Sequence, residues 1–153
     1  MRIHFVRHAE ANYDLEQVPG EFPGVPLTDL GHKQAHRTSE KIRNFKYDHI
    51  FCSDMRRTKE TIKPCLKHWT KRPIYDLRLR EISDAVTSNH NNNWFSEPKS
   101  SQIQRMKSFL NTLKSLNGEI LIVAHFGVIK YLSKQLRKEI ESPEYAGHYV
   151  LEL

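Results

Sequence analysis

Residues 3–10 read Ile-His-Phe-Val-Arg-His-Ala-Glu, and the rest of the chain is organised around this stretch. Its apolar first half is short and rich in β-forming residues, which predicts a strand over residues 2–7. The apolar run stops at Arg7 and His8, where the strand would reach the edge of a sheet. Arginine binds anions and histidine can act as a nucleophile, so these two residues are the first candidates for a functional site.

The pattern that follows alternates short apolar segments with segments of helical periodicity. Further strands are predicted at residues 47–52, 73–77, 119–124 and 145–153. Helices are predicted at residues 28–45, 55–69, 98–116 and 127–137. This alternation predicts one domain over residues 1–153, of the α/β class: a three-layer αβα sandwich with a mostly parallel central sheet. The apolar segment 119–124 should be its central strand, and the last strand could be antiparallel at an edge.

Local signals set the expected ends and buried faces of the helices. Thr28 is expected to cap the first helix, whose buried stripe should end at Phe45. Ser53 or Asp54 is expected to cap the second helix, and Pro64 should kink or shorten it. The predicted buried stripe of the third helix is Ile103, Met106, Phe109, Leu110, Leu113 and Leu116.

The composition is typical of a globular protein, with 38% hydrophobic and 27% charged residues in a chain of 153. No apolar run approaches the roughly 20 residues that a membrane helix needs. Arg7 and His8 interrupt the N-terminal apolar run before it could act as a signal peptide. Cys52 and Cys65 fall in apolar patterns and suit a reducing compartment as inert core residues. We therefore expect a cytoplasmic protein with no membrane contact.

The net charge of +6 is unevenly distributed along the chain. Residues 9–30 contain five acidic residues and no lysine or arginine, whereas residues 56–72 contain seven lysines and arginines and one glutamate. A basic protein attracts anions, so a nucleic acid and a phosphorylated substrate are the two partner classes to consider. The outer lysines are interpreted as a solvated helix face, which favours the phosphorylated substrate over the nucleic acid.

The carboxyl ends of the predicted strands carry further candidate side chains. Ser53 begins a basic segment after the second strand, Glu81 follows the third strand, and His125 follows the buried strand. Ligands of open α/β sheets bind at this edge, so these residues should converge with Arg7 and His8. Arginine forks match phosphate oxygens, and the helix that follows His125 would add N–H donors. The pattern therefore indicates a phosphate site.

Five segments, taken together, resemble the histidine phosphatase superfamily, the group of the cofactor-dependent phosphoglycerate mutases. Residues 7–10 (Arg-His-Ala-Glu) are similar to its Arg-His-Gly-Glu signature. Residues 27–35 resemble its Leu-Thr-x-x-Gly-x-x-Gln-Ala, and residues 53–61 its Ser-x-Leu-x-Arg-Ala-x-x-Thr. Residues 79–81 resemble its Leu-x-Glu element, and residues 123–129 its Val-Ser-His-Gly-Gly-Val-Ile. The segments occur in family order.

The resemblance implies a role for each candidate residue. His8 would attack phosphorus and carry a phosphohistidine intermediate. Arg7, Arg57 and His125 would hold the phosphoryl oxygens and stabilise the charge of the transition state. Glu81 would protonate the leaving oxygen and later activate water. The resemblance implies no metal and no cofactor, and a substrate that is a phosphorylated small molecule or a phosphoprotein.

Three residues depart from the family pattern. Ala9 and Phe126 stand where the family has glycine, and Asp14 stands where many members have asparagine. An anionic Asp14 would repel phosphate, so it should point away or be protonated, and it could serve as the acid instead of Glu81. Glu81 itself has an alternative interpretation, as the surface salt-bridge partner of a neighbouring arginine.

The chain is short and lacks a substrate-domain insertion after Glu81, which favours a phosphatase with an open site, as in the short bacterial phosphohistidine phosphatases. Two alternatives are a mutase that returns the phosphoryl group to its substrate, and a phospho-ligand or nucleic-acid binding module whose catalysis has lapsed. Residues 9–27 and 83–101 would set specificity, and the loop over residues 83–97 could cover the site. His32 and His36 have a spacing that can bind zinc, but no third ligand is evident nearby. The substrate and the oligomeric state stay open.

Overall fold

The computed structural model describes residues 1–14, 24–82 and 97–153. Within these residues, five strands form one sheet in the order β3-β2-β4-β1-β5. The strands are β1 (Arg2–Arg7), β2 (His49–Cys52), β3 (Ile74–Tyr75), β4 (Glu119–Ala124) and β5 (His148–Glu152). Strands β1, β2, β3 and β4 pair in parallel, and β5 pairs antiparallel with β1 at one edge. The predicted sheet, including its antiparallel last strand, is confirmed.

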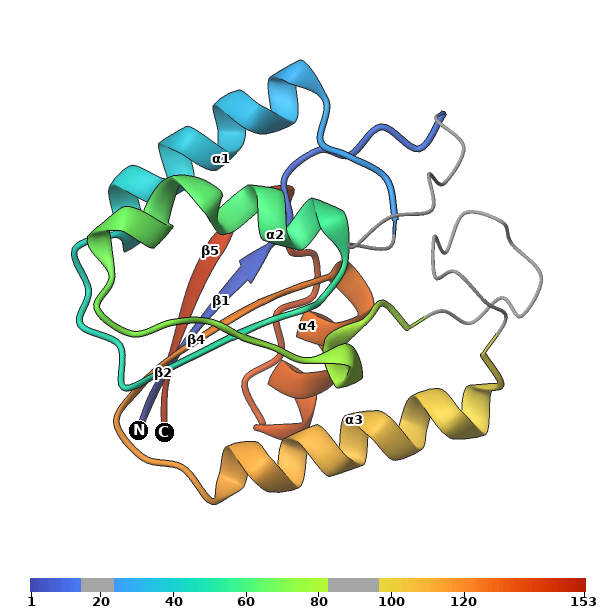
Figure 1. The fold of residues 1–153 in the computed structure, drawn as a ribbon. Helices are drawn as coiled ribbons and strands as arrows, with labels where there is room; N and C mark the ends of the chain where they lie inside the picture. The colour runs from blue at the N-terminus through green and yellow to red at the C-terminus, as the bar shows by residue number, and fades with distance from the viewer. Residues whose placement is uncertain (15–23, 83–96) are drawn as a thin grey trace.

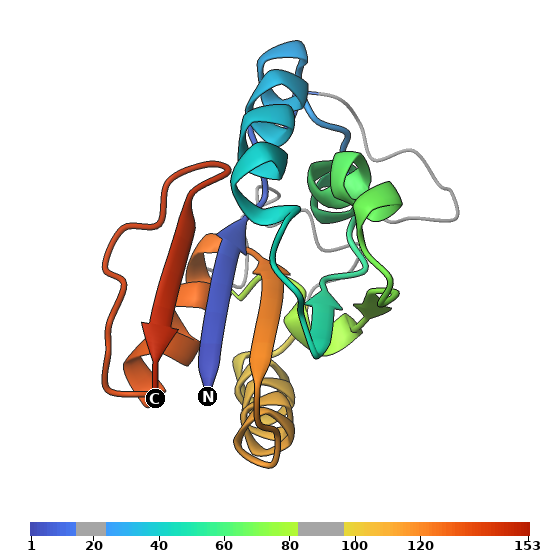
Figure 2. The same ribbon diagram turned by 90° about the vertical axis from the view of Figure 1, so that its left-hand side faces the viewer.

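Helices cover both faces of the sheet, so the fold has three layers (Figures 1 and 2). The helices are α1 (Asp29–Ile42), α2 (Arg56–Ile62), the 3₁₀ helices η1 (Lys63–His68) and η2 (Leu77–Leu79), α3 (Lys99–Lys114) and α4 (Phe126–Gln135). Helices α1 and α2 lie side by side on one face, and α3 and α4 lie on the other. The predicted αβα sandwich is confirmed.

Strand β4 lies at the centre of the sheet and contributes to both hydrophobic cores. Ile120, Ile122 and Ala124 pack with the buried side chains of α3 and α4. Leu121 and Val123, which point to the opposite face, pack with those of α1, α2 and η1. All five side chains are fully buried, as the apolar sequence of this strand predicts.

Helix α1 begins where its sequence predicts and ends earlier. The Thr28 side chain accepts a hydrogen bond from the Gly31 amide at 2.9 Å and so caps the helix. The helix ends at Ile42, and Phe45 lies beyond it with 37% of its surface exposed. The prediction that Phe45 continues the buried helix stripe was wrong, because Phe45 packs edge-on against the ring of His4 instead.

Helix α2 begins at Arg56 and has no side-chain cap. The predicted caps, Ser53 and Asp54, were wrong because both side chains have other partners. The Ser53 hydroxyl contacts the ring of His125, and the Asp54 carboxylate pairs with Arg80. The helix gives way to η1 one residue before Pro64, as expected for a residue that cannot donate a backbone hydrogen bond.

Helix α3 buries most of the predicted stripe, and Ile103 is the exception. Met106, Phe109, Leu110 and Leu113 are buried, but Ile103 is 39% exposed. Gln102 takes the buried position instead, and its side-chain amide donates to the Glu97 carbonyl at 3.0 Å. The helix ends at Lys114, so Leu116 packs against the core from beyond the helix.

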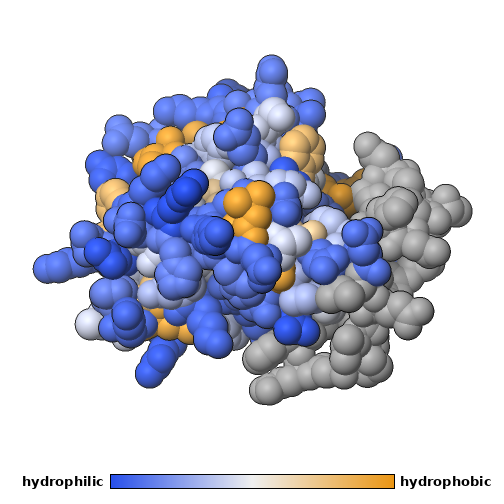
Figure 3. All heavy atoms as spheres, turned by 90° about the horizontal axis from the view of Figure 1, so that it is seen from above, coloured by the Kyte–Doolittle hydropathy of each residue, from blue (hydrophilic) through white to orange (hydrophobic). Residues whose placement is uncertain are grey.

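The outer surface over α1 and α2 is mostly hydrophilic (Figure 3). Its exposed basic side chains include Lys33, Arg37, Lys41, Lys63 and Lys67, which supports the interpretation of a solvated helix face. Among the described residues, no helix combines the length and the apolar composition needed to cross a membrane. The predicted loop over residues 83–97 lies almost wholly outside the described residues.

Candidate functional site

The candidate site lies at the carboxyl edge of the parallel strands. His8 directly follows β1, and its backbone amide donates to the Ala124 carbonyl at the end of β4, at 3.0 Å. His125 follows β4, and the centroids of the two imidazole rings are 5.2 Å apart. Ser53 follows β2, and its amide donates to the Val123 carbonyl at 2.9 Å. Parallel pairing therefore brings together side chains that are far apart in the sequence.

His8 is buried and held in one orientation. Its Nδ1 lies 2.7 Å from the carbonyl oxygen of Ala9, a group that can only accept, so Nδ1 carries a proton. Burial and then the charge of Arg57 lower the pKa of His8 well below its ordinary value, although the Ala9 carbonyl opposes them. His8 is therefore neutral near pH 7, and Nε2 keeps its lone pair. The Tyr13 hydroxyl lies 3.5 Å from that nitrogen.

Two arginines bring positive charge to His8. Arg57, on α2, is 1% exposed, and neither its Nε nor its Nη1 has a hydrogen-bond partner among the described residues. The buried Nε of Arg7 likewise has none, while its Nη1 donates to the Pro143 carbonyl at 3.0 Å. The Arg7 guanidinium also lies 3.9 Å from the ring centroid of Tyr145. A buried, unpartnered donor costs about 1–3 kcal/mol, which a bound anion would offset.

His125 is anchored by Ser53. Its Nε2 lies 2.8 Å from the Ser53 hydroxyl, and its buried Nδ1 has no partner among the described residues. Burial, followed by the charge of Arg57, lowers the pKa of His125 well below its ordinary value. A neutral His125 therefore presents one further nitrogen beside the arginines. The sequence interpretation placed Ser53 at this edge of the sheet and as a possible helix cap, but did not predict its contact with His125.

Glu81 is held by two backbone amides. Its Oε1 accepts from the Ile82 amide at 2.8 Å and from the Gly127 amide, at the start of α4, at 3.1 Å. A side chain at position 127 would not fit, because its Cβ would lie 2.8 Å from this oxygen. The Gly127 amide, which the sequence interpretation assigned to phosphate, therefore donates to Glu81 instead. The neighbouring Arg80 pairs with Asp54. The structure therefore favours the interpretation of Glu81 as a site residue over that of a surface salt-bridge partner.

The pKa of Glu81 is raised above its ordinary value by burial. The two amides and the charges of Arg57 and Arg7 act in the opposite direction but do not outweigh it. Glu81 can therefore hold a proton to a higher pH than an exposed glutamate. Because Arg57 and Arg7 act on both Glu81 and His8, all of these groups lie within electrostatic reach of one another.

Arg105 supports the segment that carries Glu81. From α3, its guanidinium donates to the carbonyl oxygens of Arg78, Arg80 and Glu81 at 2.9, 2.5 and 2.7 Å. It also pairs with the Glu97 carboxylate at 2.8 Å. The sequence interpretation missed Arg105. The available signal was its helical spacing, which places it on the same face as the buried residues Gln102 and Phe109.

The residues that depart from the family pattern have distinct environments. Asp14 is exposed, which agrees with the expectation that it points away from phosphate. The Phe126 ring lies 5.3 Å from the guanidinium carbon of Arg7 and so forms a wall of the site. The buried Ala9 has no positive φ, and its amide donates to the Thr61 hydroxyl at 2.9 Å. These substitutions leave the charged cluster intact.

The structure brings the five predicted site residues, His8, Glu81, Arg7, Arg57 and His125, into one cluster, while their chemical roles stay predictions. Arg56, the sequence neighbour of Arg57, instead pairs with Glu60 at 3.1 Å on the helix surface. His32 and His36 are exposed on α1. In the described part of the chain, no group of three or more histidine, cysteine, aspartate or glutamate side chains is placed to hold a metal ion.

Comparison with known proteins defines the class. Residues 3–90 match the histidine phosphatase superfamily (branch 1), and the chain belongs to this superfamily. It is 32% identical over 90 residues to the "probable phosphoglycerate mutase GpmB" of Yersinia pestis strain Pestoides F and of Yersinia pseudotuberculosis serotype O:1b strain IP 31758. The aligned region is 58% of this chain and 41% of those proteins, so the chain spans about two fifths of the length of these curated relatives.

Solved structures of phosphatases share the fold. The alpha-ribazole phosphatase from Shigella flexneri has a TM-score of 0.76 at 20% sequence identity, over 100% of this chain and 91% of that one. A mycobacterial glucosyl-3-phosphoglycerate phosphatase has a TM-score of 0.67, also at 20% identity, over 97% and 88% of the two chains. At 20% sequence identity, this structural similarity establishes a shared fold.

Proposed function

We propose that this protein is a metal-independent phosphatase that transfers a phosphoryl group to His8 and then to water. One observation carries the proposal: a neutral, buried His8 lies beside two arginines whose buried nitrogen atoms have no partner among the described residues. Such a cluster is complementary to a phosphoryl group, because the arginines supply positive charge and the imidazole supplies a lone pair.

In the first proposed step, Nε2 of His8 attacks phosphorus and the bond from phosphorus to the leaving oxygen breaks. Protonated Glu81 gives its proton to that oxygen, and the product alcohol departs. In the second step, water gives a proton to the Glu81 carboxylate and attacks phosphorus. The bond from phosphorus to Nε2 breaks, inorganic phosphate leaves, and both His8 and Glu81 return to their starting states.

Arg7, Arg57 and His125 would stabilise the phosphoryl oxygens during both steps. If the Ser53 hydroxyl donates to Nε2 of His125, then Nδ1 carries a proton that it can donate to a phosphoryl oxygen. Donors fixed before the reaction are effective, and the loss of one such donor typically costs about a hundredfold to a thousandfold in kcat. Because the two arginines supply the positive charge, we expect turnover to persist in the presence of EDTA.

A phosphorylated small molecule or a phosphoprotein is the proposed substrate. Support for a small molecule comes from the fold neighbours, whose names refer to alpha-ribazole and glucosyl-3-phosphoglycerate. We place the protein in the cytoplasm, where its two buried free thiols, Cys52 and Cys65, would stay reduced.

A phosphoglycerate-mutase-type transfer is the second candidate, favoured by the 32% identity to proteins named as probable mutases. A mutase returns the phosphoryl group from His8 to the substrate, so isomerised product would exceed free phosphate. A lapsed binding module, the third candidate, would bind phosphorylated ligands and form no phosphohistidine.

Hydrolysis of p-nitrophenyl phosphate with EDTA present tests the proposal. We expect release of phosphate by the unmodified protein and its loss in His8→Ala, because the other neutral imidazole of the cluster, that of His125, has its Nε2 engaged by the Ser53 hydroxyl. The exposed His36→Ala variant is the matched control and should retain full activity. Undiminished turnover in His8→Ala would rule out the proposed mechanism.

A further inference from the structure

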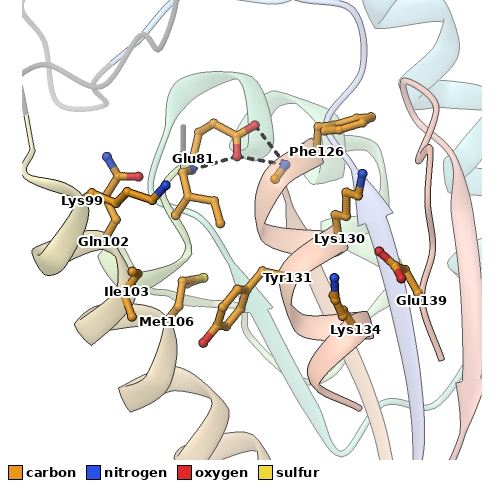
Figure 4. A pocket seen from close by; sticks show the side chains of 12 residues that line it. Glu81, Lys99, Gln102, Ile103, Met106, Phe126, Lys130, Tyr131, Lys134 and Glu139 are labelled. Atoms are coloured by element: carbon orange, nitrogen blue, oxygen red, sulfur yellow. Dashed lines mark hydrogen bonds between the residues drawn. The ribbon is translucent and has the colours of Figure 1, made fainter. Parts of the chain in front are cut away.

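A groove between α3 and α4 adjoins the candidate site. It has a volume of about 480 Å³, within the range of small-molecule sites. Glu81 and Phe126 lie at the end of the groove that meets the candidate site (Figure 4). Gly127, whose amide binds the Glu81 carboxylate, also lines the groove. The groove then continues along α4 as far as Lys134 and Glu139. It therefore begins at the carboxyl group that we propose as the proton donor.

The groove has an apolar lining and a basic rim. Its apolar side chains are Ile82, Ile103, Met106, Phe126 and Tyr131. The rim carries three lysines and one glutamate: Lys99 from α3, Lys130 and Lys134 from α4, and Glu139. The rim therefore carries a net positive charge above an apolar interior.

Lys130 and Lys134 are the main cationic feature of the rim. Both side chains are exposed, and neither forms an ion pair with the acidic side chains in the described part of the chain. Their i, i+4 spacing places two like charges side by side on one helix face, an arrangement that is unfavourable by itself. An anionic group bound between the two ammonium groups would relieve this repulsion.

Lys130 and Lys134 lie on the same helix as Gly127, so their distance from Glu81 follows from the rise of α4. Gly127 holds Glu81, and Lys130 and Lys134 follow it by three and seven residues. A helix rises 1.5 Å per residue, so the two lysines lie roughly 5 and 10 Å further along the axis. A leaving group that departs beside Glu81 would reach both lysines if its body were about six carbon atoms long.

We propose that the α3–α4 groove binds the leaving group of the substrate, an alcohol with an apolar body and an anionic far end held by Lys130 and Lys134. The anionic end is a carboxylate or a second phosphate. This inference rests on the proposed function, because it assigns the departing alcohol to the side of Glu81. It adds a substrate class: phosphate monoesters with a second negative charge about six carbons from the ester oxygen.

Two matched substrates test this assignment: 6-(phosphonooxy)hexanoate and hexyl phosphate, which differ only in the terminal carboxylate. We expect kcat/KM of the unmodified protein to be higher for the acid by about fivefold to tenfold, since partly exposed ion pairs contribute modestly. In the Lys130→Gln/Lys134→Gln variant this ratio should fall to about one. The Lys107→Gln/Lys114→Gln variant removes two exposed lysines of α3 outside the groove and should keep the ratio.

The product alcohol, 6-hydroxyhexanoate, separates a leaving-group site from an effector site. In the His8→Ala variant, where no phosphoenzyme forms, a leaving-group site requires the alcohol to compete with 6-(phosphonooxy)hexanoate for binding. Simultaneous binding of the alcohol and the ester would overturn the assignment in favour of a separate effector site. An equal kcat/KM for the two esters, or an unchanged ratio in the Lys130→Gln/Lys134→Gln variant, would also overturn it.

Binding to the His8→Ala variant separates this inference from the proposed function. Calorimetry with this variant measures the affinity for each ester without turnover. Tighter binding of 6-(phosphonooxy)hexanoate than of hexyl phosphate, lost with Lys130→Gln/Lys134→Gln, would support the groove even if no phosphatase activity were found. Equal affinity for the two esters would reject the groove even if p-nitrophenyl phosphate were hydrolysed.

Discussion

Burial shifts the pKa values of His8, the proposed nucleophile, and Glu81, the proposed proton donor, in opposite directions. It lowers the pKa of His8, whose charged form is a cation, and raises the pKa of Glu81, whose charged form is an anion. The reaction needs a neutral His8 and a protonated Glu81. The same buried environment therefore widens the pH range in which both forms coexist.

The pH dependence of kcat/KM should reflect these two shifts. Activity should fall on the acid side only well below pH 6.5, where His8 gains a proton, and on the alkaline side as Glu81 loses its proton above its ordinary pKa. In Glu81→Gln the alkaline limb should disappear, and kcat for alkyl phosphates should fall by about a hundredfold or more. The loss should be smaller for p-nitrophenyl phosphate, whose leaving group needs little protonation. An alkaline limb that persists in Glu81→Gln would assign it to another group.

The contact between Ser53 and His125 allows a second test at the residue scale. Ser53→Ala removes the one hydrogen bond, at 2.8 Å, that fixes the His125 ring within the described residues. We expect kcat to fall roughly tenfold, equivalent to about 1.4 kcal/mol of transition-state stabilisation, with a smaller change in KM. The exposed Ser115→Ala is the control. Unchanged kcat in Ser53→Ala would show that His125 needs no such anchor.

Residues that end strands were easier to predict than residues that support them. His8 and His125 follow apolar runs directly, so the sequence alone placed them at the edge of the sheet. Tyr13 and Tyr145 contact His8 and Arg7, yet both lie in irregular segments without periodicity. Their positions depend on how those segments fold back over the sheet, which local sequence does not determine.

At the scale of elements, α3 positions Glu81 through Arg105. The guanidinium forms hydrogen bonds with three carbonyl oxygens in and just after η2, those of Arg78, Arg80 and Glu81, a geometry that a single ammonium group cannot reproduce. The same guanidinium pairs with Glu97. The position of Glu81 therefore depends on a helix that follows it in the sequence.

Arg105→Lys tests this dependence. We expect a loss of about 3 kcal/mol in the free energy of unfolding, because a largely buried ion pair and its carbonyl contacts are disrupted. The alkaline limb of the pH profile should also move, because Glu81 is displaced from its amides. Urea unfolding and pH–rate measurements check the two effects, with the exposed Arg37→Lys as the control. A displaced unfolding midpoint with an unchanged pH profile would limit Arg105 to a structural role.

The errors in predicting the elements share one cause. Phe45, Ser53 and Ile103 were assigned from local periodicity or capping preference, and in each case a tertiary environment determined the outcome. Ile103 lines the groove between α3 and α4, where a half-exposed apolar side chain is tolerated. The strongly apolar β4 has no such competing arrangement, and its limits were predicted correctly.

At the scale of the whole molecule, the order of strands determines where the site forms. Strands β2, β4 and β1 are neighbours, although β4 follows the other two in the sequence by many residues. Their carboxyl ends bring Ser53, His125 and His8 together. The alternation of strands and helices predicted this edge, whereas the order of strands in the sheet required the structure.

The net charge of +6 gives a prediction for association with anionic substrates. We expect kcat/KM for p-nitrophenyl phosphate to decrease severalfold as ionic strength rises from about 0.01 to 0.15 M, because salt screens long-range attraction. An equal decrease of kcat/KM in NaCl and in KCl would show that the salt acts by screening and not by binding of a specific ion. A rate that is constant over this range would show that the net charge contributes little to substrate capture.

The central claim is that His8 becomes phosphorylated, and rapid quenching with p-nitrophenyl phosphate tests it most directly. Protein quenched in alkali, where phosphohistidine is stable, should yield a peptide that carries one phosphoryl group on His8, and the label should disappear as turnover proceeds to completion. His8→Ala should yield no labelled peptide and no burst of nitrophenol. Sustained turnover without any phosphorylated His8, or with the label on another residue, would contradict the mechanism.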